Sequence, residues 1–391
     1  MNIGRYLEIL AVSFRLGLTS FGGPVAHLGY FQDEYVKRRK WLDDRTYADL
    51  IALCQFLPGP ASSQVGISIG MVRGGVLGGL LAWIGFTLPS VVALIVFALY
   101  VQQVDTGGSV WIEGLKLVAV AVVAHAILNM GKKLTPDQPR IAMAVLAAIA
   151  VLFYQTALAQ ISVIVLAGIF GYLLFKHSDL PEGADIHLNL RKSIGMISLI
   201  LFFGLLLFLP VMTSFFPNIY VQLVDIFYRI GSIVFGGGHV VLPLLEREVV
   251  PPGLISEEVF LAGYGAAQAV PGPLFTFSSF IGTSIEGISG GLVAVLAMFF
   301  PSFLLLIGVL PFWNTIRKKK SIRAALLGVN AAVVGILIAA LYDPIWTSAV
   351  DQTKDFAVVL ASFAFLYFWK VPAWLIVIFT VLFNVVLSGL L

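Results

Sequence analysis

Several stretches of this chain stay apolar over lengths that match the thickness of a lipid bilayer. An α-helix crosses the hydrocarbon core with about 20 residues, and the apolar runs cover residues 80–100, 141–175 (enough for two short passes), 194–210, 291–312 and 374–391. Of the 391 residues, 59% are hydrophobic and only 12% are charged, which leaves a soluble fold without its charged exterior. We therefore expect an all-α polytopic membrane protein.

Charge and motif content exclude several classes of function. The net charge of +3 is too small to indicate a nucleic-acid partner. Cys54 is the single cysteine, so we expect no internal disulfide and no cysteine-based metal site. There is no Walker A loop, no His-Glu-x-x-His and no Ser-His-Asp set, so we expect no enzyme, no cofactor and no metal. The N-terminal "MNIGRYLEILAVSFRLG" is interpreted as the start of a membrane helix rather than a signal peptide.

The second half of the sequence repeats the first. The segment "RLGLTSFGGPVAHL" from Arg15 aligns with "RIGSIVFGGGHVVL" from Arg229, and Glu34 then aligns with Glu248. After a one-residue gap, a Pro-Gly-Pro aligns with a second Pro-Gly-Pro. Further on, "GGVLGGLLAWIGFTLPS" aligns with "EGISGGLVAVLAMFFPS". Such self-similarity indicates a duplicated architecture.

We expect each repeat to hold about six helical segments. The first repeat is assigned to residues 1–176, a connecting loop and linking helix to 177–218, and the second repeat to 219–391. An odd linking segment reverses the second copy, which predicts inverted-topology repeats. The positive-inside rule fits most loops and fails at "KRRKWLDDR" and "EREVVPPGLISEE". Either the Pro-Gly-Pro segments are re-entrant or broken, or those two loops are functional exceptions.

The two Pro-Gly-Pro segments are the first candidate site. Proline ends a helix, and a broken backbone in a membrane is tolerated only inside protein or beside a wet cavity. The helix that follows offers free N–H groups and a dipole that favours an anion. The alternative is a packing kink with Ser/Thr hydroxyls bonded to their own backbone. The candidate residues are Pro58, Gly59, Pro60, Ser62 and Ser63, and in the second half Pro271, Gly272, Pro273, Thr276 and Ser278.

Two further motifs accompany each Pro-Gly-Pro. Phe21-Gly22-Gly23 and Phe235-Gly236-Gly237 place backbone without side chains late in an apolar helix, for tight helix packing or for an unwound binding segment. Gln55 and Gln268 each lie three residues before a Pro-Gly-Pro. A buried amide at that point would donate to an anion or brace the break.

Arg15 and Arg229 are the most informative charges, because each lies six residues before its Phe-Gly-Gly in an apolar helix. Intramembrane arginine is costly and usually faces the bundle interior with a partner. Two guanidinium groups would suit a doubly charged oxyanion. The alternatives are snorkelling to the interface and, for Arg229, an i,i+4 pair with Asp225.

Coupling to an ion gradient would need a titratable group. The candidates are Glu34, Glu248 and His239. For the two glutamates, a helix-end salt bridge with Lys37 or Arg38, or with Arg247, is the competing interpretation. His239 has no histidine counterpart, because Val25 occupies its aligned position.

These paired modules resemble the chromate transporter family (chromate ion transporters, CHR) in its long-chain, two-domain form. The resemblance covers nearly the whole chain and carries over Arg15, Phe21, Gly22, Gly23, Gln55, Pro58, Gly59 and Pro60 with their second-half counterparts. It implies a 13-pass fold with antiparallel halves in the inner (cytoplasmic) membrane, and secondary transport of chromate that gives resistance by efflux, with sulfate as a related oxyanion. Pro24 is replaced by Gly238 in the second copy, so these two positions need not act alike.

The leading hypothesis is an oxyanion transporter that works by alternating access and is driven by an ion gradient. The expected partners are chromate or sulfate, the lipid bilayer, and a proton or other coupling ion; a homodimer is compatible with such a chain. An anion channel and an integral-membrane enzyme acting on lipid-linked substrates are the two competing hypotheses.

Overall fold

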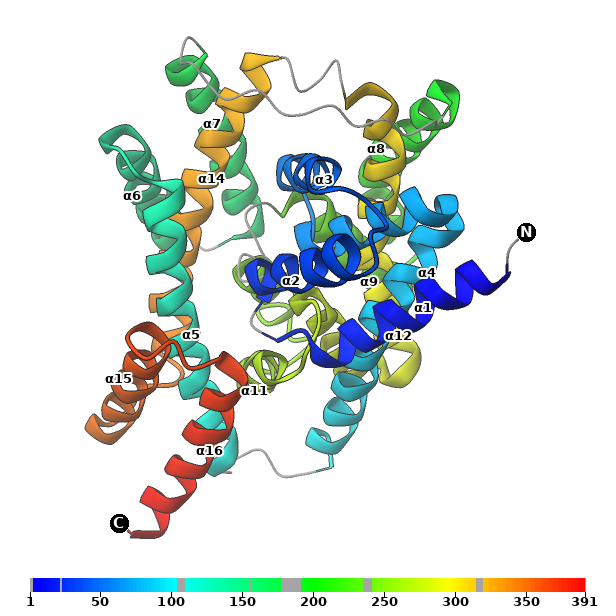
Figure 1. Cartoon of the computed structure of the whole chain (residues 1–391). Coiled ribbons are helices and arrows are strands. Elements are labelled where there is room, and N and C mark those ends of the chain that lie inside the picture. Colours follow the sequence, from blue (N-terminus) through cyan, green and yellow to red (C-terminus); the bar gives the residue numbers. More distant parts are fainter. Residues whose placement is uncertain are drawn as a thin grey trace. The chain divides into compact units, whose positions relative to one another are not determined.

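The computed structural model describes residues 3–21, 23–103, 110–154, 156–176, 191–234, 241–313 and 319–390, and these residues form helices and short connections without any strand (Figure 1). The first part contains α1 Ile3–Thr19, α2 Gly23–Phe31, η1 Gln32–Arg38, α3 Asp44–Phe56, α4 Ala61–Val101, α5 Val110–Leu134, α6 Gln138–Phe153 and α7 Ala157–Phe175. It is followed by α8 Lys192–Phe215 and α9 Ile219–Ile233. The remainder contains α10 Val241–Val249, α11 Glu257–Ala269, η3 Leu274–Thr276, α12 Phe277–Val309, η4 Leu310–Phe312, α14 Lys320–Ala340, η5 Leu341–Trp346, α15 Thr353–Tyr367 and α16 Ala373–Leu390.

Polar side chains fix the starts of several helices. In each case an oxygen just before the helix accepts a hydrogen bond from an amide of the first turn, which satisfies one of the donors that a helix N-terminus leaves unpaired. The capping residues are Asp43 (α3), Asp137 (α6), Thr156 (α7), Asn218 (α9) and Ser256 (α11).

The chain folds into two compact units, and each unit combines pieces of both sequence halves. The first consists of Met1–Ala93, Asp179–Gly238 and Pro271–Arg323. The second consists of Leu94–Ser178, His239–Val270 and Ala324–Leu391. The compact units therefore do not coincide with the sequence repeats, and the repeat boundaries 1–176, 177–218 and 219–391 stay a prediction.

In the described part of the chain, five helices are long and apolar enough to cross a membrane: Ala61–Val101, Val110–Leu134, Lys192–Phe215, Leu274–Phe312 and Lys320–Trp346. Shorter apolar helices cover Gln138–Phe153, Ala159–Phe175 and Ala373–Val385. In α8, protein buries only 22% of the most apolar 18-residue stretch. A helix this apolar and this exposed is suited to lipid rather than to water. The expectation of an all-α polytopic membrane protein is confirmed.

Two of these long helices are in fact hairpins. In α4 the backbone leaves the helical region at Gly74 (φ −142°, ψ 22°) and Gly75 (φ 65°, ψ −163°). In α12 it does so at the aligned positions Glu286 (φ −140°, ψ 33°) and Gly287 (φ 64°, ψ −160°). Glycine is the residue that adopts positive φ without strain. The repeat seen in the sequence is therefore also a repeat of backbone conformation.

Close glycine contacts hold the arms of each hairpin together. A Cβ added to Gly70 would overlap the carbonyl oxygen of Gly78, and one added to Gly282 would overlap that of Gly290. The arm before each turn covers residues 61–73 or 277–285, at most about 20 Å of helix. This length is too short for a hydrocarbon core of about 30 Å. Only the arm after each turn is long enough to span.

The first helix of each half packs on the long arm of a hairpin in the first unit. A Cβ added to Gly17 of α1 would lie 2.6 Å from the carbonyl oxygen of Phe86. Gly231 of α9 makes the equivalent close approach to Met298 of α12. Phe86 and Met298 are aligned residues, so α1 and α9 pack against equivalent positions of the two long arms. In the second unit α5 packs against α11, α15 and α16.

We expect Gly70→Ala to lower the thermal stability of the purified protein in detergent. The new methyl group would overlap the backbone of the other hairpin arm, and overpacking of this kind costs about 1–3 kcal/mol. Gly204→Ala on α8 is the matched control, because nothing lies within 4 Å of its added Cβ and alanine favours a helix by about 0.5–1 kcal/mol over glycine. Thermal unfolding followed by tryptophan fluorescence measures both. Equal shifts in the two variants would contradict the close packing of the hairpin arms.

Candidate functional site

The Pro-Gly-Pro segment of each half is hydrogen-bonded to the first helix of the other half. The Gly59 amide donates to the carbonyl oxygen of Val234 at 2.6 Å, and the Gly272 amide donates to that of Ser20 at 3.0 Å. Ser20 and Val234 are aligned positions at the ends of α1 and α9. We call these two bonds the crossed pair. It joins residues far apart in the sequence into one centre inside the first unit.

The backbone breaks at both Pro-Gly-Pro segments. In the first half, α3 ends at Phe56 and α4 begins at Ala61; in the second, α11 ends at Ala269 and η3 leads into α12. Gly59 has a φ of +114° and Gly272 a φ of +102°, values that disfavour a residue with a side chain. Pro58 and Pro60, and Pro271 and Pro273, flank these glycines.

The space above each central glycine is closed by a serine of the opposite half. An added Cβ would lie 2.7 Å from Ser302 Oγ at Gly59 and 2.9 Å from Ser90 Oγ at Gly272. Ser90 and Ser302 are themselves aligned, each directly after a proline inside its long helix. Contacts from each half to the Pro-Gly-Pro of the other half are therefore made by side chains as well as by the backbone.

A glutamine that the sequence analysis did not single out braces the first break. Gln64 Nε2 donates to the Pro58 carbonyl oxygen at 2.7 Å and to Ser302 Oγ at 3.2 Å. The expectation of a buried amide at Gln55 is wrong, because that side chain is exposed. Gln268 is half-buried, and within the described part of the chain its Nε2 has no hydrogen-bond partner. Gln64 lies after the break, where the helix turn returns its side chain toward the proline carbonyl.

The segment after the first break runs back along α3. The Cys54 sulfur before the break lies 3.8 Å from Ser68 Oγ after it. In one continuous helix, residues 14 apart would be separated by about 21 Å. The short arm 61–73 is therefore antiparallel to α3, and the Pro-Gly-Pro forms the tip between them.

The hydroxyl groups near the two breaks are used differently. Thr276 Oγ1 donates to the Pro273 carbonyl oxygen at 2.7 Å, and Ser278 Oγ to that of Phe275 at 2.8 Å. These second-half hydroxyls follow the back-bonding alternative. In the first half Ser62 Oγ lies 3.2 Å from Nδ1 of His27, and the buried Ser63 Oγ has no partner among the described residues.

Unpaired buried polar atoms gather on the first-half segments around the crossed pair. Within the described ranges they include Ser20 Oγ, His27 Nε2, Ser63 Oγ and Thr87 Oγ1. His27 also packs edge-on against Phe86, with ring centroids 5.3 Å apart. Buried hydroxyl and imidazole groups without partners are costly unless something binds them. The three hydroxyl groups among them can each donate a hydrogen bond to an oxyanion.

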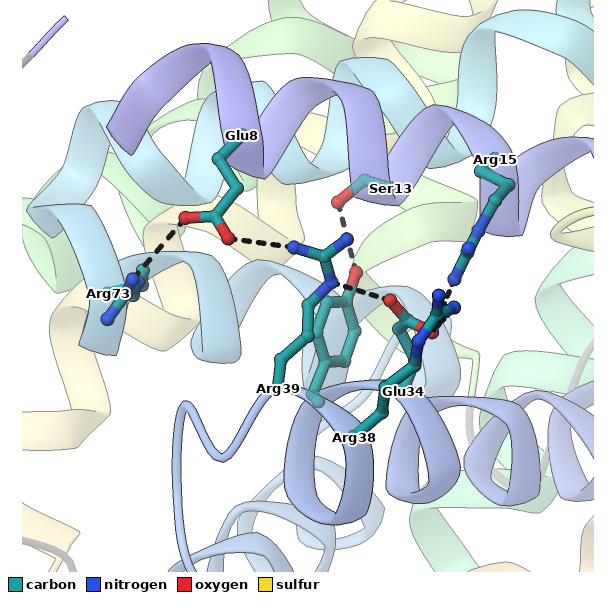
Figure 2. Close-up of polar contacts among 8 residues, drawn as sticks. Glu8, Ser13, Arg15, Glu34, Arg38, Arg39 and Arg73 are labelled. Carbon is teal, nitrogen blue, oxygen red and sulfur yellow. Dashed lines mark hydrogen bonds and ion pairs between the residues drawn. The ribbon is translucent and has the colours of Figure 1, made fainter. Parts of the chain in front are cut away.

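Arg15 belongs to a charge network between α1, η1 and the hairpin turn of α4 (Figure 2). Glu34 forms ion pairs with Arg15, with Arg38 at 3.2 Å and with Arg39 at 2.6 Å. Glu8 accepts from Arg39 at 2.7 Å and from Arg73 at 3.3 Å. Four guanidinium groups against two carboxylates leave this arginine network with a net charge of +2. The bridge from Glu34 to Arg38 was one sequence-based alternative; Lys37 pairs with Asp33 instead.

Glu34 is an anchor for cations. Its burial opposes ionisation, but the hydrogen bonds and charges of Arg39, Arg15 and Arg38 outweigh this, and the pKa of the carboxyl falls below its usual value. η1 lies outside the helices long enough to span the membrane. Because its pKa is lowered, the carboxyl of Glu34 stays ionised at neutral pH. It is therefore poorly suited to carry a proton, which weakens it as a coupling candidate.

Arg229 has a different environment from its counterpart. It forms the i,i+4 ion pair with Asp225 at 2.8 Å, and the two side chains are 23% and 8% exposed. The position aligned with Asp225 is Ala11, whereas Gln222 and Ile285 align with Glu8 and Arg73. The two arginines therefore do not form two equivalent free charges. The arginine network, with its net charge of +2, consists of first-half residues.

Some predicted residues lie outside the described residues: Gly22, Phe235, Gly236, Gly237 and His239. Phe21 is half-buried between α1 and α2, and Gly23 begins α2 with a φ of +76°. Glu248 is half-buried on α10. α1 ends at Thr19, before the first Phe-Gly-Gly segment, and α2 begins at Gly23, the last residue of that segment.

We expect Arg39→Met to lower the free energy of unfolding by about 1–3 kcal/mol, the range for a charge-assisted hydrogen bond lost from a partly buried site. Arg39 is the bridge between Glu34 and Glu8, and Glu34 is only 6% exposed. Lys37→Met on the same element is the control and should leave stability unchanged, because both Lys37 and Asp33 are exposed. Thermal and chemical unfolding in detergent compare the two. A larger loss from Lys37→Met would show that the arginine network does not hold α1 to η1.

Comparison with known proteins gives a consistent family. The chromate transporter family model matches residues 7–172 and 221–385, one match in each half, which fits a repeat. A chromate transport protein of Pseudomonas aeruginosa is 26% identical over 93% of this chain and 88% of its own length. A chromate transport protein of Cupriavidus metallidurans is 28% identical over 88% and 84%, and an uncharacterised transporter of Methanocaldococcus jannaschii is 25% identical over 85% and 83%.

No solved structure shows significant similarity to the chain. The family model nevertheless covers most of the sequence, and its two matches begin and end close to the repeats read from the sequence. The apolar helices agree with this assignment. The protein is a multi-pass protein of the cytoplasmic membrane and belongs to the chromate transporter family.

Proposed function

We propose that this protein is a secondary active transporter that exports chromate by alternating access, with an oxyanion site built around the crossed pair. The single observation that supports the site best is the reciprocal hydrogen bonding of Gly59 to Val234 and of Gly272 to Ser20. It joins two broken helices and the ends of two others in one unit. A ligand bound by residues of both halves would have its contacts changed by any movement of one half relative to the other.

The chemistry near the crossed pair suits an anion. The short arm 61–73 begins directly after the first Pro-Gly-Pro, and the first amides of a helix point out of its N-terminus with the positive end of the dipole. In the second half the amides of Thr276 and Phe277 already donate to carbonyl oxygens of the η3 turn and of Pro273. Ser63 Oγ is a buried hydroxyl without a described partner and can donate a hydrogen bond. We assign the ligand chiefly to the first half, because Thr276 and Ser278 already use their hydroxyls on the backbone.

The arginine network supports a doubly charged substrate. Its net charge of +2 lies on α1, η1 and the α4 turn (Figure 2). Arg15 and Arg38 share Glu34, and their side chains are 46% and 64% exposed. Exposed guanidinium groups that share one carboxylate retain hydrogen-bond capacity for a tetrahedral dianion. In this proposal Arg15 attracts the anion.

The repeats supply the mechanism. The matching hairpin turns and the crossed pair agree with halves related by a pseudo-two-fold axis, as inverted repeats are. A short arm that starts at a Pro-Gly-Pro tip and is too short to span behaves as a re-entrant segment if that tip lies inside the membrane. Rocking of the two halves about the tips would expose the site to either side in turn.

Chromate and sulfate are both tetrahedral dianions of similar size, so a site made of N–H and O–H donors would accept both. Sulfate is therefore expected to compete with chromate. An anion channel is the second candidate, since the same donors could line a continuous pore. An enzyme acting on lipid-linked substrates is a third.

The test is flux of labelled chromate in proteoliposomes of synthetic lipid, with and without a pH gradient and with unlabelled sulfate as competitor. Accumulation of chromate against its gradient supports active transport, and dissipation without accumulation would indicate a channel. Full flux in lipid without any lipid-linked substrate excludes the enzyme hypothesis. No protein-dependent chromate movement would overturn the proposed function.

We expect Arg15→Ala to lower the initial rate of chromate flux about tenfold or more, because a charge-assisted hydrogen bond contributes about 1.5–3 kcal/mol and 1.4 kcal/mol is a factor of ten. The protein should still fold, since Glu34 keeps Arg38 and Arg39. Arg5→Ala, at an exposed position on the same helix, is the matched control and should transport normally.

Arg229 needs a different design, because removing it alone would leave the buried Asp225 unpaired. The double variant Asp225→Asn with Arg229→Gln removes both charges. A smaller loss of flux than for Arg15→Ala is expected if the site is polarised toward the first half. Wild-type flux in both the Arg15 and the double variant would contradict any arginine role in the anion path.

A further inference from the structure

A second cluster of charges, separate from the arginine network, lies in the second unit. Glu246 on α10 is 4% exposed, although it is a carboxylate. Arg247 Nε lies 3.2 Å from Glu246 Oε2, and Arg247 also donates a hydrogen bond to Asp343 Oδ2 at 3.5 Å. The three residues combine two acids with one guanidinium group. We call them the Glu246 cluster.

The Glu246 cluster is poorly balanced when both acids are ionised. Within the described residues, Glu246 Oε2 accepts no hydrogen bond, although Arg247 Nε lies 3.2 Å away. Asp343 has the shared arginine as a hydrogen-bond donor. A buried carboxylate oxygen without a donor is unstable as an anion. A proton on Glu246 would leave one of these two acids, Asp343, ionised beside the Arg247 guanidinium group.

Among the described elements next to α10, α11 and η5 add negative charge, and α7, α11 and η5 contain no Lys, Arg or His. Two nearby acids, Glu257 at the start of α11 and Asp343 of η5, disfavour the ionised form of Glu246 by charge repulsion. α7, which packs against α10, has no Asp, Glu, His, Lys or Arg from Ala157 to Phe175. Arg247 is therefore the cation that faces Glu246 from these elements.

Burial, together with Glu257 and Asp343, raises the pKa of Glu246 to about 7 against the opposing effect of Arg247. α10 lies outside the helices that are long enough to span the membrane. The contrast with Glu34 is direct: three guanidinium groups keep that carboxyl ionised, whereas Glu246 has one that is shared. A carboxyl that titrates near neutral pH is suited to binding and releasing a proton in the working range.

The position of α10 in the chain connects this carboxyl to the transport motifs. α10 begins at Val241, directly after the second Phe-Gly-Gly segment, and α11 then leads to the second Pro-Gly-Pro. A change of charge on Glu246 would alter the contact between α10 and η5 through Arg247 and Asp343. In sequence, α10 therefore lies between the two second-half motifs.

We infer that Glu246 is the proton-binding residue that couples chromate movement to a proton gradient, with Arg247 and Asp343 as its positioning partners. This inference rests on the proposed transport function. It names the proton as the coupling ion and replaces Glu34 as the residue that binds it. Each cycle would load one proton on Glu246 from one side of the membrane and release it on the other.

The test compares wild type, Glu246→Gln and Glu258→Gln in proteoliposomes that contain the pH dye pyranine. Glu258 is exposed on α11 and serves as the matched carboxyl control. Two quantities are measured: chromate-dependent proton movement, and exchange of labelled for unlabelled chromate without any gradient. Glu246→Gln should lose proton movement and gradient-driven accumulation at least tenfold while it keeps exchange within about twofold. Glu258→Gln should match wild type.

The outcomes separate this inference from the proposed function. If wild type exchanges no chromate, the transport proposal itself fails. If wild type transports chromate and Glu246→Gln still moves protons at the wild-type rate, the transport proposal stands and the coupling role of Glu246 is wrong. Loss of exchange together with proton movement in Glu246→Gln would likewise overturn a purely coupling role, provided that the variant elutes as a folded protein.

A stability measurement tests the titration without any transport. Because the folded carboxyl binds its proton more tightly than the unfolded one, whose pKa is about 4.3, its contribution to stability is complete below that pH and is lost as the pH rises through about 7. The melting temperature of wild type should therefore fall more steeply between pH 5 and pH 8 than that of Glu246→Gln. Parallel profiles would contradict a proton on Glu246 in the folded protein.

Discussion

The first unit depends on how two broken helices satisfy their backbone. Inside a membrane, an amide without an acceptor costs several kcal/mol, since no water replaces the lost bond. The tip of each Pro-Gly-Pro solves this with a carbonyl from the other half, and each of those carbonyls belongs to the last turn of a first helix. The positive φ of Gly59 and Gly272 aims the amides in the required direction. These two bonds lie at the centre of the other matched features: the two hairpins, the packing of α1 and α9 on the long arms, and the paired serines.

The two halves have the same backbone conformation at their hairpin turns but carry different charged side chains. The turns at Gly75 and Gly287 have almost the same dihedral angles, yet the arginine network belongs to the first half and the Glu246 cluster to the second. The position aligned with Glu246 is Gln32, which is neutral. Duplication supplies the symmetry that movement needs, and divergence separates two tasks that one carboxylate performs badly together: holding cations and exchanging protons. In the proposed mechanism, the substrate site and the coupling residue therefore belong to different halves.

The sequence predicts the features that are local or repeated. Apolar length predicts the helices, the alignment predicts the matched breaks, and proline with glycine predicts where helices end. It does not predict partners distant in the chain. Gln64 was missed and Gln55 wrongly expected to be buried, because only the return of the short arm along α3 decides which amide reaches Pro58. The convergence of Arg38 and Arg39 with Arg15 on Glu34 depends likewise on how α1 and η1 pack, which their local sequence does not specify. Glu246 gave no signal, since burial of an acid cannot be read from its neighbours in sequence.

The crossed pair also says something about ancestry. A half-length chain with one Pro-Gly-Pro tip and one first helix would carry an unmet donor and an unmet acceptor. Two identical copies would satisfy both bonds at once, since each would give what the other lacks. Association is therefore built into the half, and a fused gene would inherit an interface that already worked as a dimer. Fusion then frees the copies to mutate independently, which a symmetric pair of identical chains cannot do.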